Sequence, residues 1–127
     1  MPKKKILIVD DEKSLTTLLK LNLEDTGDYE VRTENWAEDA LPAAREFKPD
    51  LVLLDIIMPR MAGGDVVALF RADPVLKNTP IVFITAAVPP HIVEENDGII
   101  CELPCLAKPV TLEKVIETIE KYARKPA

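Results

Sequence analysis

Apolar runs of strand length alternate with stretches of helical period along the 127 residues of the chain. The runs typical of strands cover residues 6–9, 29–33, 51–54, 81–84 and 106–107, and the run at 29–33 is the weakest of them. The unbroken apolar run at 51–54 is typical of a central strand that is buried on both faces. This alternation predicts an α/β fold, in which helices cover both faces of a parallel sheet.

Helical periodicity between these runs predicts the helices. They are expected over about 14–25, from a cap at Asn35 to about Phe47, from about Val66 to Asp73, over about 90–96, and from a cap at Thr111 to about Ala123. An apolar stripe of leucines at positions 15, 18, 19 and 23 predicts the first helix. Asn35 and Glu38 have the spacing of a capping box, and Pro42 inside the second pattern predicts a bend or a late start.

The stretch between Thr85 and Lys108 follows the alternation least well. Pro89-Pro90 opens it, and Ile99-Ile100-Cys101 is more typical of a strand than of a helix. The fourth helix is therefore predicted to be short.

Composition and charge are those of a single globular domain. Hydrophobic residues make up 47% and charged residues 30% of the chain. A domain of this size buries roughly two thirds of the surface that its unfolded chain exposes. No segment approaches the ~18 apolar residues of a membrane span, and the start of the chain does not fit a signal peptide, so a cytoplasmic location without membrane contact is expected. The net charge of −6 argues against direct nucleic-acid binding.

The cysteines, Cys101 and Cys105, do not predict a metal site. Together with His91, the single histidine, they are too few for a zinc centre. In a reducing compartment a disulfide is disfavoured, so both are expected to be reduced thiols.

Chemistry-bearing residues follow the predicted strands. Asp10-Asp11 end the first run, Asp55 ends the third, Thr85 the fourth, and Lys108 follows the last. Open parallel sheets bind ligands at the carboxyl ends of their strands, where these side chains are expected to meet. Carboxylates gathered there repel one another unless a hard divalent cation compensates, which predicts Mg²⁺.

The same residues predict a mechanism for handling phosphoryl groups. Asp11 and Asp55 would bind Mg²⁺ directly and Asp10 through water, while the central Asp55 would attack phosphorus as the nucleophile. Lys108 and Thr85 would neutralise and hydrogen-bond the phosphoryl oxygens. Taken one at a time these residues also have ordinary structural interpretations, since acids after strands are common helix caps and threonine is common in strands. It is their joint placement that favours the chemistry.

Four sequence pieces carry a resemblance to a known family. They are Ile8-Val9-Asp10-Asp11-Glu12, the segment 53–59 with Met61 and Gly63, Thr85-Ala86, and Lys108-Pro109. Together they resemble the receiver domain of two-component response regulators over essentially the whole chain. The resemblance implies one domain over 1–127, without an output domain, and a flavodoxin-like, doubly wound, five-stranded parallel sheet of order 2-1-3-4-5.

The resemblance also implies a function. A histidine kinase or phosphotransfer protein would phosphorylate Asp55, with Mg²⁺ held by Asp10, Asp11, Asp55 and the backbone carbonyl of Ile57. Such a domain hydrolyses its own phosphoryl group slowly but turns over no separate substrate. Phosphorylation would change binding to a downstream effector protein or output domain, or drive dimer formation, through movement of Thr85.

The chain departs from the family pattern at three positions. Cys105 stands where the family usually has a Tyr or Phe that turns inward on activation, so the switch of Thr85 and residue 105 cannot use an aromatic ring. Ile57 and Ala87 resemble positions that tune dephosphorylation, and neither can orient a water molecule. Slow hydrolysis of the phosphoryl group is therefore expected.

Three alternatives remain open. An aspartate-nucleophile phosphohydrolase shares the chemistry, but this chain lacks a second aspartate two residues after Asp55 and has no room for a substrate cap. A degenerate receiver would bind partners without being phosphorylated, in keeping with Cys105 and the irregular fourth segment. A dinucleotide-binding domain is disfavoured because no glycine-rich loop follows the first strand.

Overall fold

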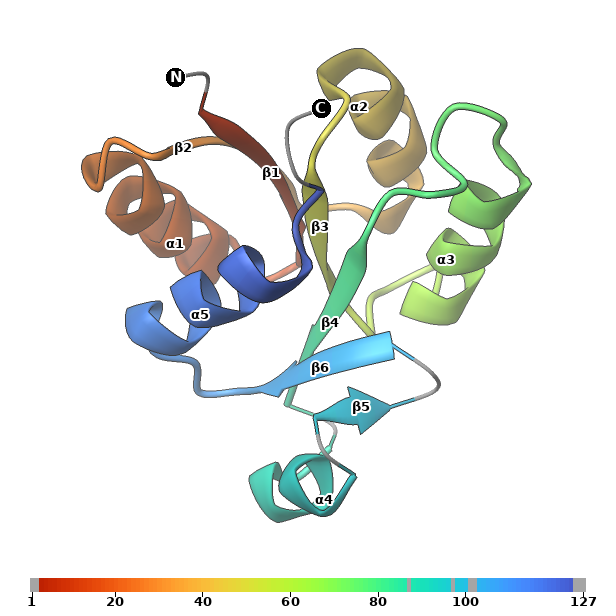
Figure 1. The fold of residues 1–127 in the computed structure, drawn as a ribbon. Helices are drawn as coiled ribbons and strands as arrows, with labels where there is room; N and C mark the ends of the chain where they lie inside the picture. The colour runs from red at the N-terminus through yellow and green to blue at the C-terminus, as the bar shows by residue number, and fades with distance from the viewer. Residues whose placement is uncertain (1–2, 87, 97, 101–102, 125–127) are drawn as a thin grey trace.

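A parallel sheet forms the middle layer of the molecule (Figure 1). The computed structural model describes residues 3–86, 88–96, 98–100 and 103–124. Its strands are β1 (Lys4–Val9), β2 (Tyr29–Glu34), β3 (Leu51–Asp55), β4 (Ile81–Thr85), β5 (Ile99–Ile100) and β6 (Leu103–Ala107). Its helices are α1 (Lys13–Asp25), the 3₁₀ turn η1 (Ala37–Asp39), α2 (Ala40–Phe47), α3 (Gly63–Ala72), α4 (Pro90–Glu95) and α5 (Leu112–Tyr122).

The predicted fold is confirmed. The five parallel strands lie in the order β2-β1-β3-β4-β6, which is 2-1-3-4-5 when only the parallel strands are numbered. α1 and α5 cover one face, and α2 and α3 cover the other (Figure 1). Each face has its own apolar core, and all five residues of β3 are buried between them, as its unbroken apolar run predicted.

The irregular stretch folds as a short helix followed by a hairpin. α4 begins at Pro90, where a proline is tolerated because the first N–H of a helix has no internal partner, and ends at Glu95. Gly98 then adopts a φ of 76°, and β5 pairs antiparallel with β6. This short strand is an addition to the predicted sheet. The strand-like residues 99 and 100 are confirmed as β5, and Cys101 lies outside the described residues.

The predicted helix starts are partly right. Thr111 caps α5 as predicted, because its Oγ1 accepts a hydrogen bond from the Lys114 N–H at 3.2 Å. Pro42 lies in the first turn of α2, which starts late, at Ala40, after η1. The predicted cap at Asn35 is wrong. Trp36 holds the N-cap position of η1, and the Asn35 amide instead donates to Asp10, directly after β1, and to Thr16 of α1.

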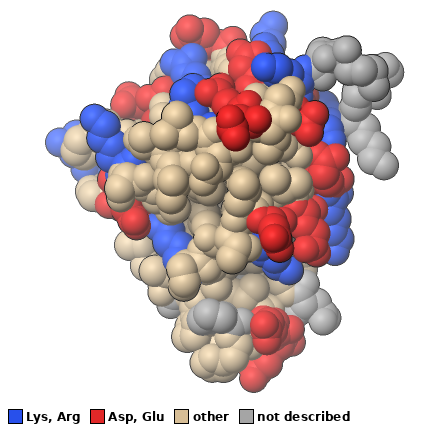
Figure 2. All heavy atoms as spheres, turned by 90° about the vertical axis from the view of Figure 1, so that its left-hand side faces the viewer, with Lys and Arg blue, Asp and Glu red and all other residues tan. Residues whose placement is uncertain are grey.

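One predicted core position of the first helix is also wrong. Leu19 and Leu23 are buried, but Leu18 is 56% exposed and Leu21, one turn further on, is 63% exposed. Figure 2 faces the side of the molecule on which α1 and α5 lie, and it shows a broad area without charged residues there. No helix among the described residues is long and apolar enough to span a membrane.

Candidate acidic site at the carboxyl edge of the sheet

Strand register brings the predicted acids together. Val9 at the end of β1 pairs with Leu54 of β3, so the residues that follow, Asp10 and Asp55, emerge side by side. One carboxylate oxygen from each of Asp10, Asp11 and Asp55 lies within 4.8 Å of the other two. Asp10 and Asp55 are buried, whereas Asp11 is exposed to solvent.

Lys108 lies among these carboxylates. Its backbone N–H donates to the Thr85 carbonyl at 2.8 Å, which fixes the end of β6 beside the end of β4. Its Nζ lies 2.9 Å from Asp10 Oδ2, 3.5 Å from Glu12 Oε1 and 3.6 Å from Asp55 Oδ2. Burial lowers the pKa of Lys108, but the close ion pair with Asp10 and the charges of Asp55 and Glu12 outweigh it, so the net pKa is raised. The ammonium therefore stays charged.

Asp55 is held in an unfavourable environment for a negative charge. Burial, and then the neighbouring charge of Asp10, raise its pKa from 3.8 to about 6. Lys108 and the Ile57 N–H, which donates to Asp55 Oδ1 at 3.3 Å, act in the opposite direction but do not cancel the rise. The site thus has more negative charge than the protein itself neutralises.

Two local backbone features place the acids. The Glu12 N–H donates to Asp10 Oδ1 at 2.9 Å, which fixes the turn from β1 into α1. After β3, the Gly63 N–H donates to the Ile56 carbonyl at 2.7 Å. A Cβ atom at Gly63 would lie 2.7 Å from the Asp55 carbonyl oxygen, so only glycine lets α3 begin this close to the strand.

The donor set fits a hard divalent cation. Carboxylate oxygens are the ligands that Mg²⁺ and Ca²⁺ take, and three of them point to one place. Asp10 Oδ2 is buried and accepts no hydrogen bond of good geometry from the described residues, although Lys108 Nζ is close. A hollow of about 350 Å³ opens beside these acids, lined by Asp55, Ile57, Thr85, Ala86 and Lys108.

The remaining predicted residues lie in two places. Thr85 is buried at the end of β4 and lines the hollow, and the side chain of Ile57 is 62% exposed at its rim. Cys105 is not at the acids. It is buried in β6 opposite Phe83 and lines a separate cavity of about 490 Å³ between α4, β6 and α5. Ala87 lies outside the described residues.

Two residues near the acids, Asn35 and Arg60, make contacts that the sequence did not predict. The Asn35 Nδ2 donates to the Asp10 carbonyl at 2.8 Å and to Thr16 Oγ1 at 3.0 Å. The Arg60 guanidinium lies over the Trp36 ring, 5.1 Å from its centroid. A polar residue directly after β2, at the same sheet edge as the acids, was the available signal for Asn35. The Arg60 contact joins two loops and left no sequence signal.

The fold and the position of the acids define a class of protein. Sheets of this order bind ligands where the strand order reverses, between the first and third strands, and Asp10, Asp11 and Asp55 lie there. This is an α/β domain of flavodoxin-like topology with an acidic pocket at its switch point. Residues 6–120 match the model of the response regulator receiver domain, and the chain belongs to that family of signalling modules in two-component systems.

Individual relatives agree with this assignment. The polar-differentiation response regulator DivK of Brucella anthropi is 34% identical over 122 residues, which cover 96% of this chain and 97% of DivK. The alkaline phosphatase synthesis transcriptional regulatory protein PhoP of Bacillus subtilis is 45% identical over 83 residues, 65% of this chain but 33% of PhoP. Among solved structures, chemotaxis protein CheY4 of Vibrio cholerae superposes with a TM-score of 0.79 at 30% identity, covering 94% of this chain and 98% of CheY4.

Proposed function

We propose that this receiver domain accepts a phosphoryl group on Asp55 in a Mg²⁺-dependent reaction. The donor would be a phosphohistidine on a histidine kinase or a phosphotransfer protein. The observation that supports this most is the cluster of three carboxylates within 4.8 Å at the switch point, with Lys108 Nζ beside two of them. Such a cluster is costly for folding and is useful where positive charge and phosphoryl oxygens are to be bound.

Asp55 is proposed as the nucleophile because it ends the central strand and lines the hollow. A carboxylate oxygen of Asp55 would form the new bond to phosphorus as the bond from phosphorus to the donor nitrogen breaks, with that electron pair leaving on the imidazole. Only the ionised form attacks. A pKa of about 6 leaves most of Asp55 ionised near pH 7, and a bound cation would favour the ionised form further.

Asp10, Asp11 and Asp55, with the Ile57 carbonyl, would hold the Mg²⁺. When bound, the ion supplies positive charge to the carboxylates and to the phosphoryl oxygens. Lys108 would exchange part of its contact with Asp10 and Asp55 for a phosphoryl oxygen. The buried Thr85 hydroxyl, on the wall of the hollow, would donate a hydrogen bond to another.

Phosphorylation is proposed to act through partner binding, either to an effector or output domain or by forming a dimer. Movement of Thr85 would shift Ala107, its pairing partner in β6. Ala107 and Cys105 both line the cavity beside β6, so the shape of that cavity would change as well. Because residue 105 is not aromatic, no ring can fill this cavity on activation. Ile57 at the rim of the hollow offers no polar group to orient water, so the acyl phosphate is expected to hydrolyse slowly.

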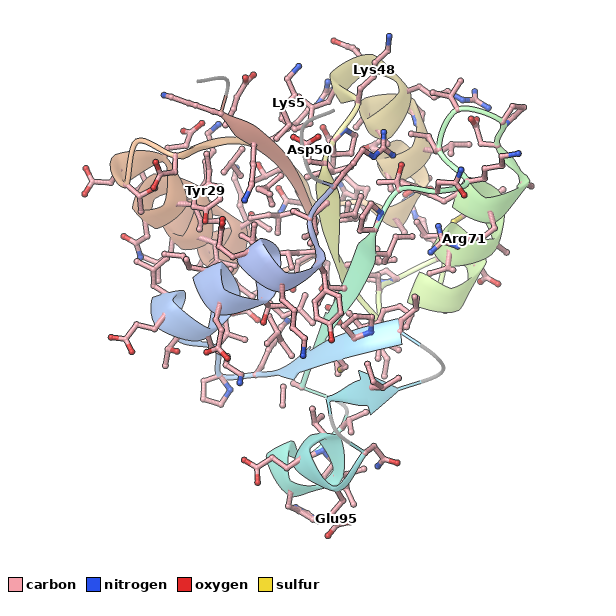
Figure 3. All side chains as sticks on the ribbon, in the orientation of Figure 1. Lys5, Tyr29, Lys48, Asp50, Arg71 and Glu95 are labelled. Atoms are coloured by element: carbon pink, nitrogen blue, oxygen red, sulfur yellow. The ribbon has the colours of Figure 1, made fainter. Side chains whose placement is uncertain are left out.

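The test is acid-labile, hydroxylamine-sensitive phosphorylation of the purified protein by a small phosphodonor such as acetyl phosphate. One phosphoryl group per chain is expected with Mg²⁺, and none with EDTA or in Asp55→Asn. Asp50→Asn is the matched control. Asp50 directly precedes the same strand, at its amino end and away from the acids, and its Oδ2 accepts a hydrogen bond from the Lys5 N–H (Figure 3). Labelling of Asp55→Asn equal to that of the wild type would contradict the proposal.

A second candidate is a degenerate receiver that docks partners without phosphorylation. It is favoured by Cys105 and by the six-residue α4 with the antiparallel β5 after it, which alter the face next to β6. A wild-type protein that is folded, takes no phosphoryl group with Mg²⁺ and still binds a partner would support it.

A further inference from the structure

One short segment contacts both loops that carry the acids. This bridging segment comprises residues 34–38, between β2 and the first turn of η1. Asp10 and Asp11 lie on the loop after β1, and residues 56–62 form the loop after Asp55. The bridging segment contains no acid of the cluster itself and was predicted to do no more than cap a helix.

Its first contact holds Asp10 from both sides. The Asp10 N–H donates to the Glu34 carbonyl at 3.1 Å, and the Asp10 carbonyl accepts from Asn35 Nδ2 at 2.8 Å. The same Nδ2 donates to the buried Thr16 Oγ1 at 3.0 Å, so it also ties the first turns of α1. The backbone of Asp10 is thereby fixed on β2 while its carboxylate is directed into the cluster.

Its second contact holds the loop after Asp55. The Trp36 ring faces the Arg60 guanidinium at 5.1 Å, and Arg60 Nη1 lies 3.5 Å from both carboxylate oxygens of Glu38. Arg60 has a φ of 71°, a conformation that costs energy for a residue with a side chain, so the contacts of that side chain help to keep the backbone there. Both of these contacts of the Arg60 side chain come from the bridging segment.

We infer that Asn35 and Trp36 are positioning residues for the cation-binding acids. They fix the position of the loop after β1 relative to the loop after β3, so that the acids are already close together before a cation binds. This inference rests on the proposed function, since it assigns these residues to the same acidic site. Residues that hydrogen-bond to metal ligands and orient them do not contact the ion, yet their substitution typically lowers metal affinity about 10–100-fold.

The test is the affinity for Mn²⁺, followed by electron paramagnetic resonance, with competition by Mg²⁺. Asn35→Ala is expected to weaken binding on the order of tenfold. Trp36→Leu keeps an apolar side chain but loses the cation–π contact, and is expected to weaken binding roughly two- to fivefold. Tyr29→Phe is the matched control, because it removes one side-chain hydrogen bond, from Tyr29 Oη to Glu120 at 2.6 Å, at the opposite sheet edge (Figure 3).

Three outcomes can be told apart. Weaker Mn²⁺ binding in the Asn35 and Trp36 variants, with unchanged binding in Tyr29→Phe and folded protein by circular dichroism, supports the inference. Wild-type affinity in both variants overturns it and leaves the proposed function standing. A wild-type protein that binds neither ion overturns both. If Asn35→Ala does not fold, Asn35→Ser replaces it, since a serine is too short to reach both acceptors, and Trp36→Leu alters an exposed position.

Discussion

Two aspartates of this protein are equally buried and yet have opposite surroundings. Asp55 and Asp73 are each 5% exposed. Asp73, at the end of α3, accepts hydrogen bonds from Arg45 Nε at 2.7 Å and from the Val75 and Leu76 N–H groups at 2.9 and 3.2 Å. From the described residues Asp55 accepts one long hydrogen bond, donated by Ile57, and it lies beside two other acids.

Their pKa values differ accordingly. The hydrogen bond from Arg45, followed by that from Val75, holds the pKa of Asp73 below its usual value. Burial and then Asp10 raise the pKa of Asp55 to about 6. Burial alone therefore does not decide whether a carboxylate stabilises the fold. Asp73 has its partners within the protein, and Asp55 lacks enough positive charge until a ligand brings it.

The largest expected effect is the loss of stability in Asp73→Ala. This substitution leaves the Val75 and Leu76 N–H groups without their acceptor and removes the partner of the Arg45 guanidinium. Urea unfolding should show a much lower midpoint than for the wild type. Asp25→Ala, at an exposed position, is the control and should leave the midpoint nearly unchanged. Equal midpoints for the two variants would mean that Asp73 contributes nothing.

Asp55→Asn is expected to change stability in the opposite direction, because it should make the fold more stable. Removing a buried charge whose pKa is raised should increase the free energy of unfolding by about 1–3 kcal/mol at pH 7 without divalent cations. Urea unfolding in EDTA measures this gain. Asp50→Asn, where the acid has a backbone donor, should show no gain. A less stable Asp55→Asn would contradict the raised pKa.

The pH dependence gives the next comparison. A carboxyl with a raised pKa stabilises the fold fully below its unfolded value of 3.8, and this contribution disappears as pH rises through about 6. The stability advantage of Asp55→Asn should therefore grow between pH 4 and 7. Asp73 has the reverse sign, because its contribution is present above the unfolded value and is lost as pH falls through its lowered pKa. Unfolding of the wild type and both variants from about pH 2 to about pH 7 tests the two signs, with the change for Asp73 expected below about pH 4.

The smallest expected effect is stabilisation by Mg²⁺. At a Mg²⁺ concentration ten times its dissociation constant, the wild type should gain about 1.4 kcal/mol, because the ion binds the folded state only. Thermal melts with Mg²⁺ and with EDTA measure the gain. It should shrink in Asp55→Asn and in Asp11→Asn, and it should persist in a variant at Asp50. A gain of equal size in all of them would place the ion elsewhere.

Much of the fold followed from the sequence because its signals are local. The unbroken apolar run of β3 and the acid that ends it were enough to predict a central strand and a carboxylate at its edge. The convergence of Asp10 and Asp55 then follows from topology, since parallel strands end at one edge. Pro89-Pro90 also correctly predicted a short α4.

Other features could not be predicted because one residue type satisfies several patterns. Asn35 has the spacing of a helix cap, and the choice between that role and a bond to Asp10 depends on β1 and β2 being neighbours. Leu18 fits the helical stripe but lies outside the contact that α1 makes with the sheet. The close approach of Gly63 to Asp55 appears in sequence only as a turn residue.

The hairpin partner of β6 also bears on how copies of the molecule can meet. The end strand of an open sheet offers unpaired backbone groups that can recruit a strand from another chain. Here Ile99 and Ile100 of β5 pair antiparallel with Pro104 and Leu103 and so cover that edge of β6. Because β5 is only two residues long, it leaves little backbone with which a strand from another chain could pair.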